Sequence, residues 1–211
     1  MHALRDAVSR GTVIRRVKRW TVMTLAVVLV SPDGTASVRA AGNGAPEARY
    51  NLMAVFLYNF ASFVDWPSDP VLDQGPIVIG VLGRNPFQSA AAAIEKKTVN
   101  GRPIRFRTFT AVADLEPTHI LFLDREASGQ LGAARQRLQG HAVLTVGETD
   151  DFTRQGGVVR FFEVAASETG AADRSLRLEI NEKLAQDLKL QIRSKLLRLA
   201  TVVDYPPPAI P

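Results

Sequence analysis

An uninterrupted apolar segment, Ile77–Leu82, is broken only by Gly80 and is followed by alternating segments of helix and strand character. A run without polar alternation is typical of a strand buried on both faces, which is the usual setting of a parallel strand. The segments after it follow at the spacing of βα units. They are a helix at 86–96, strands at 103–109, 118–123 and 142–146, and a helix at 127–138.

The pattern changes after Gly147. Two strand-like segments, 156–165 and 176–181, are joined by a loop of small residues at 166–173, which predicts an antiparallel hairpin at the sheet edge. Ser194–Val203 has helical spacing, with Leu196, Leu197 and Ala200 on one face. We therefore predict an α/β fold, a three-layer sandwich around a mostly parallel sheet of about five to six strands, with a C-terminal hairpin and a C-terminal helix.

The aromatic run FLYNFASFVDWP at 56–67 predicts the end of an amphipathic helix that extends from Arg49 to Trp66. Pro67 biases the residue before it away from helical geometry and so ends the helix. The apolar residues recur at helical spacing and should share one face, which predicts that they pack on the sheet. The alternative is that part of this face stays exposed and docks a partner protein. The residues are Leu52, Met53, Phe56, Phe60, Phe63 and Val64.

The basic character of the chain is confined to its first 40 residues. Seven of the 26 Lys and Arg residues, but only two of the 21 acidic residues, precede residue 41, which leaves 19 of each in the remainder. Nucleic-acid binding is excluded on this basis, because affinity for phosphates needs a standing positive surface. Basic residues 15–19 followed by the uncharged stretch 20–30 predict a signal peptide. We expect cleavage near Ala40 and a periplasmic protein; the alternative is a retained anchor.

The expected organisation is a signal peptide at 1–40, a disordered lead-in at 41–48, a single α/β domain at 49–204 and a Pro-rich tail at 205–211. The chain has no cysteine, so thiol catalysis, thiolate metal sites and disulfides are excluded. We expect no metal and no cofactor, because His119 and His141 lack metal-ligand spacing and have the pattern of structural or surface residues. Serine-nucleophile and nucleotide-binding motifs are also missing.

Polar residues follow several of the predicted strands directly. In a doubly wound sheet, ligands bind at the carboxyl ends of the strands. The residues at this edge are mixed in charge and include no general base with a partner, so they predict a small-molecule site and argue against catalysis. The candidate ligand-binding residues are Arg84, Asn85, Asp124, Arg125, Glu148 and Asp151.

In order along the chain, the blocks FLYNFASFVDWP, IVIGVLGRNPF, KTVNGRPI, HILFL, AVLTVGE, FTRQGGVVRF, LRLEIN and LKLQIRSKLLRLATVV resemble the YfiR family of exported bacterial proteins. The resemblance extends over 49–203, and the first and last blocks are its most specific parts. Well-studied relatives carry cysteine pairs, whereas this chain has none. Redox control of the kind that such pairs allow is therefore not expected here.

The resemblance implies a periplasmic regulator and not an enzyme. YfiR-like proteins bind the periplasmic part of an inner-membrane diguanylate cyclase and hold it inactive, which lowers cyclic di-GMP and restrains biofilm formation. An OmpA-like outer-membrane lipoprotein relieves the block. The expected partners are thus the cyclase or another membrane sensor protein, the lipoprotein and a second copy of the chain in a homodimer. The alternative function, from the residues alone, is a periplasmic small-molecule sensor or solute-binding module.

Overall fold

The computed structural model describes residues 44–165 and 174–206. The predicted signal peptide, the hairpin loop at 166–173 and the end of the Pro-rich tail lie outside these ranges. The first helix, α1 (Gly44–Phe63), begins five residues before the predicted start, so the second half of the expected lead-in is helical. It ends at Phe63, three residues before the predicted end at Trp66, because Val64–Asp65 are extended and form a short strand.

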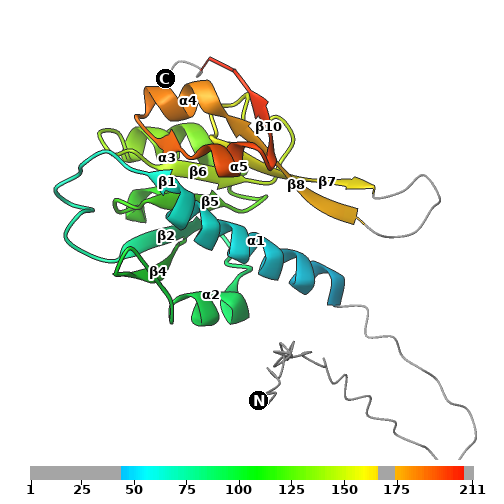
Figure 1. Ribbon diagram of the computed structural model, residues 1–211, viewed down its shortest axis with the longest axis horizontal. Coiled ribbons are helices and arrows are strands. Elements are labelled where there is room, and N and C mark those ends of the chain that lie inside the picture. Colours follow the sequence, from blue (N-terminus) through cyan, green and yellow to red (C-terminus); the bar gives the residue numbers. More distant parts are fainter. Residues whose placement is uncertain (1–43, 166–173, 207–211) are drawn as a thin grey trace, which may run out of the picture. The chain divides into compact units, whose positions relative to one another are not determined.

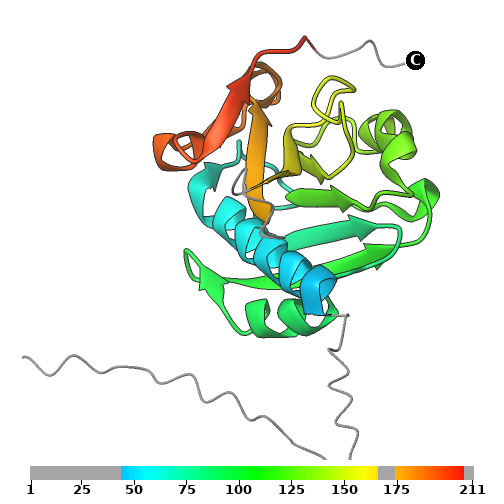
Figure 2. The ribbon, with the colours of Figure 1, turned by 90° about the vertical axis from the view of Figure 1, so that its right-hand side faces the viewer.

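An eight-stranded mixed sheet forms the middle layer, in the order β10-β8-β7-β6-β5-β2-β4-β3 (Figures 1 and 2). Five neighbouring strands from β4 to β7 are parallel, and β7 and β8 form the predicted antiparallel hairpin. The α/β fold with a mostly parallel sheet is confirmed. The strands are β2 (Ile77–Leu82), β3 (Thr98–Val99), β4 (Arg102–Phe109), β5 (Ile120–Leu123), β6 (Leu144–Gly147), β7 (Val159–Ala165), β8 (Arg174–Asn181) and β10 (Ala200–Val203).

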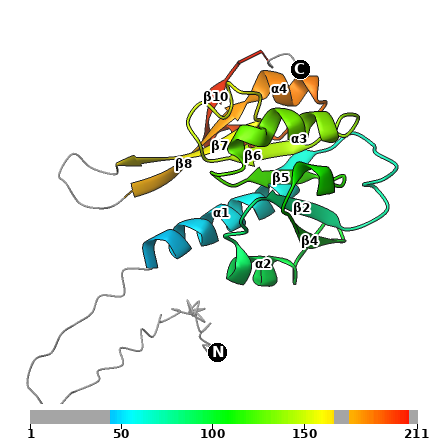
Figure 3. The same cartoon turned by 180° about the vertical axis from the view of Figure 1, so that it is seen from behind.

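Two hydrophobic clusters lie on opposite faces of the sheet. Helix α1 packs on one face together with α2 (Gln88–Ile94), α4 (Glu182–Asp187) and α5 (Ser194–Leu197). Helix α3 (Leu131–Arg137), preceded by the 3-10 turn Ser128–Gln130, covers the other face and is nearest the viewer in Figure 3. A further 3-10 turn, Val112–Asp114, follows β4. Because β2 and β5 contribute buried side chains to both clusters, their sequences are apolar without alternation.

The aromatic face of α1 is in the core, as predicted. Phe60 is fully buried, and its ring stacks on Phe161 of β7 at a centroid distance of 6.0 Å. The exception is Leu52, which the sequence places on this face but which remains 46% exposed beside Val55 at 50%. A helix turns by 100° per residue, so Met53 takes the inward position and Leu52 lies at the margin of the stripe.

The C-terminal helix is shorter than predicted. Only Ser194–Leu197 is helical, and Ala200–Val203 forms β10, parallel to β8. Three consecutive β-branched residues, Thr201, Val202 and Val203, favour an extended backbone once an open sheet edge is within reach. The predicted hairpin is therefore one strand inside the edge. Helix α4 was not predicted, although Asn181 caps it by accepting a hydrogen bond from the Leu184 N–H at 3.1 Å.

A small second sheet joins the two ends of the domain. Strand β1 (Val64–Asp65) pairs antiparallel with β9 (Gln191–Ile192), directly after α1. The Arg193 N–H donates to the Phe63 carbonyl at 3.0 Å. Its guanidinium also pairs with both oxygens of Asp65, at 3.1 and 2.8 Å. This clamp fixes the point at which the chain leaves α1.

Candidate functional site

The predicted ligand-binding residues follow strands at the carboxyl edge of the sheet, where their polar groups bind mainly to neighbouring residues outside the predicted set. Asp124, at the end of β5, is buried and accepts hydrogen bonds from the Arg84 N–H at 2.8 Å and the Ala127 N–H at 2.6 Å. Asn85 accepts from the Phe87 N–H at 2.9 Å, before α2 begins. The Arg84 side chain pairs with Glu126 in solvent. Asp124 and Asn85 thus shape the two βα turns at this edge.

Glu148, at the end of β6, is the buried charge of this edge. Its side chain is 2% exposed and binds Arg49 of α1, with 2.5 Å between Nη2 and Oε2, while Tyr50 donates to it at 3.2 Å. Burial would lower the pKa of Arg49, but the hydrogen bond that it donates to Glu148 and the charges of Glu148 and Glu163 raise it. Burial and the Glu148 charge raise the pKa of Tyr50. Sequence reasoning placed Glu148 here but missed Arg49.

The two remaining predicted residues are peripheral. Arg125 is exposed, with its Nη2 4.0 Å from Glu148 Oε2. Asp151 has a positive φ of 58° and lies 3.4 Å from the Arg154 guanidinium. Among the described residues it has no hydrogen bond or ion pair with the other five. A ligand at this edge stays a prediction, and it would have to compete with existing ion pairs.

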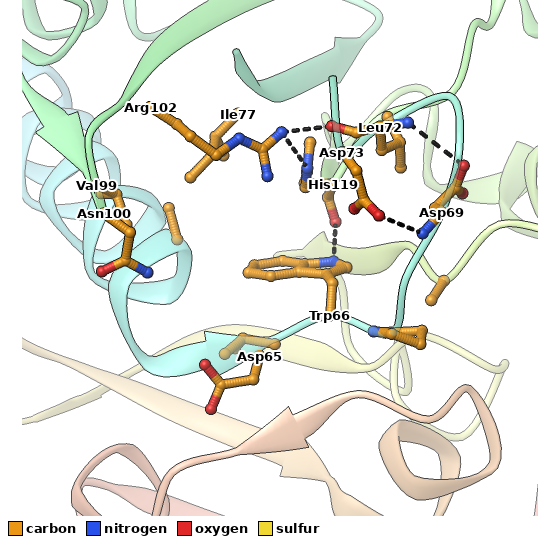
Figure 4. A pocket seen from close by; sticks show the side chains of 14 residues that line it. Asp65, Trp66, Asp69, Leu72, Asp73, Ile77, Val99, Asn100, Arg102 and His119 are labelled. Carbon is orange, nitrogen blue, oxygen red and sulfur yellow. Dashed lines mark hydrogen bonds between the residues drawn. The ribbon is translucent and has the colours of Figure 1, made fainter. Parts of the chain in front are cut away.

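A cavity of about 160 Å³ opens at the opposite, amino edge of the sheet (Figure 4). It lies between the end of α1, the loop before β2, and the starts of β4 and β5. Three side chains, Trp66, Arg102 and His119, form its polar wall, and each comes from a different block of the family-like sequence. Segments distant in the chain therefore converge here.

His119 sits immediately before β5 and is 2% exposed. Its Nδ1 accepts a hydrogen bond from the Val78 N–H at 3.1 Å, and its carbonyl accepts one from Trp66 Nε1 at 3.1 Å. The Trp66 and His119 rings meet edge to face, with centroids 5.5 Å apart. Burial, reinforced by the charge of Arg102, lowers the pKa of His119 to about 4. The imidazole is therefore neutral at physiological pH.

Arg102 begins β4 and holds the loop before β2. Its Nε donates to the Gly75 carbonyl at 2.9 Å, and its Nη2 donates to the Leu72 carbonyl. The same Nη2 lies 3.3 Å from His119 Nε2. Arg102 thus connects the loop to the buried imidazole.

Carboxylates line the other side of the cavity. Asp69 accepts hydrogen bonds from the Val71 and Leu72 N–H groups through Oδ1, and its Oδ2 lies 2.6 Å from His141 Nδ1. These bonds outweigh burial and lower the pKa of Asp69. Asp73 accepts from Ser68 and from the Asp69 N–H through Oδ2. The cavity therefore has hydrogen-bond donors on one wall and acceptors on the other.

The sequence predicts a structural or surface role for His119 and says nothing of Arg102. Each side chain has a backbone hydrogen-bond partner, so both residues have a structural role. Both side chains also line the cavity. The sequence did contain one indication of this cavity. Arg102 and His119 lie at the amino ends of predicted strands, and Trp66 lies at the end of the predicted helix. Only the register of the sheet shows that these positions meet.

The described part of the chain contains neither a cluster of metal-binding side chains nor a helix that could span a membrane. Within residues 44–165 and 174–206, no three or more His, Asp or Glu side chains are grouped so that they could hold a metal ion. In the same ranges, no helix has the length and apolarity that crossing a membrane requires.

A family model described as YfiR/HmsC-like matches residues 50–201, which is most of the chain. The chain belongs to the YfiR/HmsC-like family. This family is one of periplasmic regulators, and all three polar residues of the cavity wall lie inside the matched range.

Comparison of the YfiR/HmsC-like chain with curated proteins finds no match. Among solved structures, it is similar to the ABC domain in complex with L-Trp from Streptococcus pneumonia, with 13% identity and a TM-score of 0.44 over 60% of this chain. A conserved domain protein from Vibrio cholerae O1 biovar El Tor str. N16961 matches with 17% identity and a TM-score of 0.42 over 74% of this chain. The chain spans 54% and 59% of those two chains.

Proposed function

We propose that this protein is a non-catalytic periplasmic repressor that binds an inner-membrane diguanylate cyclase and holds it inactive, thereby lowering cyclic di-GMP and biofilm formation. Membership of the YfiR/HmsC-like family over residues 50–201 is the observation that carries the proposal. A repressor of this kind binds the inactive conformation of its target more tightly than the active one. A difference of about 3 kcal/mol suffices to shift the target by two orders of magnitude.

A surface suited to such a contact lies where β7, β8 and the segment before β10 meet. It is a shallow groove with Phe162 and Val164 on one side and Leu199, which is 64% exposed, on the other. The side chains of Arg177 and Arg198 also line it, and neither guanidinium has a hydrogen bond or ion pair with another described residue. Strand β10 beside it is an edge strand, whose outer backbone groups can pair with an added strand.

Apolar side chains flanked by unpaired arginines complement a partner segment that carries apolar residues next to carboxylates. We assign this groove to the periplasmic part of the cyclase. A second copy of the chain or the OmpA-like lipoprotein are the other occupants that the same experiment separates, because each would co-purify as a different species.

The test is a deletion strain complemented with variants of the groove. Deletion should raise cyclic di-GMP and surface attachment, and the unaltered chain should restore both and co-purify with the cyclase from membranes. Arg198→Glu combined with Leu199→Asp should fail to restore them while keeping the melting temperature. The matched control is Arg137→Glu with Val71→Asp, which places the same changes on exposed residues elsewhere. Unchanged cyclic di-GMP after deletion, with the chain expressed, contradicts the proposal.

A second candidate function, a periplasmic small-molecule sensor, is favoured by the cavity bounded by Trp66, Arg102 and His119. The two functions are compatible, since a repressor can respond to a solute. A thermal-shift screen against metabolites tests the second function alone, because a ligand that binds only the folded state raises the melting temperature. A screen without any stabilising compound contradicts it.

A further inference from the structure

The buried imidazole of His119 faces more hydrogen-bond donors than it can accept. The Val78 N–H lies 3.1 Å from Nδ1, and Arg102 Nη2 lies 3.3 Å from Nε2. A neutral imidazole has one acceptor nitrogen and one N–H donor. Whichever nitrogen carries the proton, that N–H meets another N–H. The better placed bond is the one from the backbone of Val78, so the proton belongs on Nε2, beside Arg102.

Arg102 adds donors of its own at the same place. Its Nε and Nη2 bind the Gly75 and Leu72 carbonyls, whereas the described residues supply no hydrogen-bond partner for Nη1. In Figure 4 the guanidinium and the imidazole lie side by side above the Trp66 ring. These donors face a cavity of about 160 Å³, and an acceptor that enters it can bind them.

We propose that this cavity binds a small uncharged molecule through a carbonyl oxygen, which accepts hydrogen bonds from His119 Nε2–H and from the Arg102 guanidinium. The inference rests on the second proposed function, that the cavity takes a solute, and adds its chemical class. The carbonyl oxygen has two lone pairs and can accept from both donors at once. The Trp66 ring provides an apolar surface for the rest of the molecule.

The charges around the cavity favour a neutral ligand over an anion. Asp69 and Asp73 line the wall opposite Arg102, and a third carboxylate, Asp65, is already paired with Arg193. His141 and two backbone N–H groups already bind Asp69, so Asp73 is the carboxylate that offsets the charge of Arg102 and weakens the attraction of the cavity for an anion. The described residues supply no hydrogen-bond partner for Asp73 Oδ1, which can therefore accept an N–H from a ligand. A primary amide, which has a carbonyl and an N–H₂ group, matches both walls.

Acetamide is the probe, and acetate at equal ionic strength is its charged counterpart of the same size. Both are titrated into the folded chain while the ring nitrogen signals of His119 and the side-chain signals of Arg102 are followed by NMR. Acetamide should shift these signals saturably, and acetate should not. His119→Asn keeps an acceptor for the Val78 N–H but removes the Nε2 donor, so the apparent Kd for acetamide should rise roughly tenfold.

Three results overturn the inference. If acetate saturates the signals and acetamide does not, the cavity takes anions and the assigned chemical class is wrong, while the solute-binding function stands. If neither probe moves the signals but a metabolite from the thermal-shift screen stabilises the chain, that function also stands and the carbonyl assignment falls. If no compound stabilises the chain and neither probe binds, the function and the inference fall together, and water fills the cavity.

Discussion

Arg49, on the first helix, forms an ion pair with Glu148, whose side chain at the end of β6 is 2% exposed. The pair joins α1 to the carboxyl edge of the sheet. Without Arg49, the carboxylate of Glu148 would be a buried charge that lacks its main ion-pair partner. A buried ion pair contributes little relative to apolar residues, but its disruption leaves an uncompensated charge.

Replacement of Arg49 by methionine should therefore destabilise the fold by about 3 kcal/mol. The measurement is the free energy of unfolding from urea denaturation. The double variant Arg49→Met with Glu148→Leu is the control, because it removes both charges and should recover most of the loss. If the single variant is as stable as the unaltered chain, Glu148 does not depend on Arg49.

Phe60→Ala should lower the free energy of unfolding by about 3–5 kcal/mol, since the ring is fully buried between α1 and β7. Val55→Ala, at a half-exposed position of the same helix, should change it by no more than about 0.5 kcal/mol. An unchanged melting temperature in Phe60→Ala, together with lost partner binding, would instead show that the aromatic face is an interface.

The buried neutral imidazole of His119 should make stability fall in mild acid. Its pKa is lowered from 6.5 to about 4 in the folded state, so between these values the unfolded chain binds more protons than the folded one. The contribution is fully present above pH 6.5 and is lost as the pH falls toward 4, with a total of about 3 kcal/mol. Urea denaturation across this range should show a slope that His119→Asn reduces. If His119→Asn has the same pH dependence of the free energy of unfolding as the unaltered chain, His119 is not the group responsible.

Gly83→Ala should destabilise the chain by at least about 2 kcal/mol. Gly83 has a φ of +95°, and a Cβ there would lie 2.5 Å from the Asp124 carboxylate. Gly129→Ala is the control, because a Cβ at Gly129 meets nothing within 4 Å. Equal stabilities of the two variants would show that the turn after β2 does not require glycine, and that Asp124 can move.

The sequence was most informative where burial determines the residue pattern. Ile77–Leu82 is apolar throughout because β2 has parallel neighbours on both sides and helices on both faces, and this was predictable from one segment. The core position of Phe60 followed from helical spacing in the same way. Neither inference needed knowledge of distant residues.

Tertiary contacts decided the features that the sequence did not predict. Ala200–Val203 follows a helical segment and has helical spacing, but it pairs with β8 because that sheet edge is otherwise open. The cavity at the amino edge depends on the register of β2 and β5, which places His119 next to Val78 and Arg102. Asp124 and Glu148 follow strands at the carboxyl edge, but their hydrogen-bond partners could not be inferred from spacing, and ligand binding at this edge stays a prediction.

The clamp between β1 and β9 joins Val64 to Ile192, residues separated by most of the domain. Contacts so far apart in the chain form late, because the intervening loop must be closed first. The β1–β9 pairing at the end of α1 therefore cannot form during synthesis until residues 191–193 have been made. A chain truncated before Gln191 would also lack β10 and the Arg193 ion pair. We expect α1 to be cleaved by proteases more readily in such a chain than in the unaltered one.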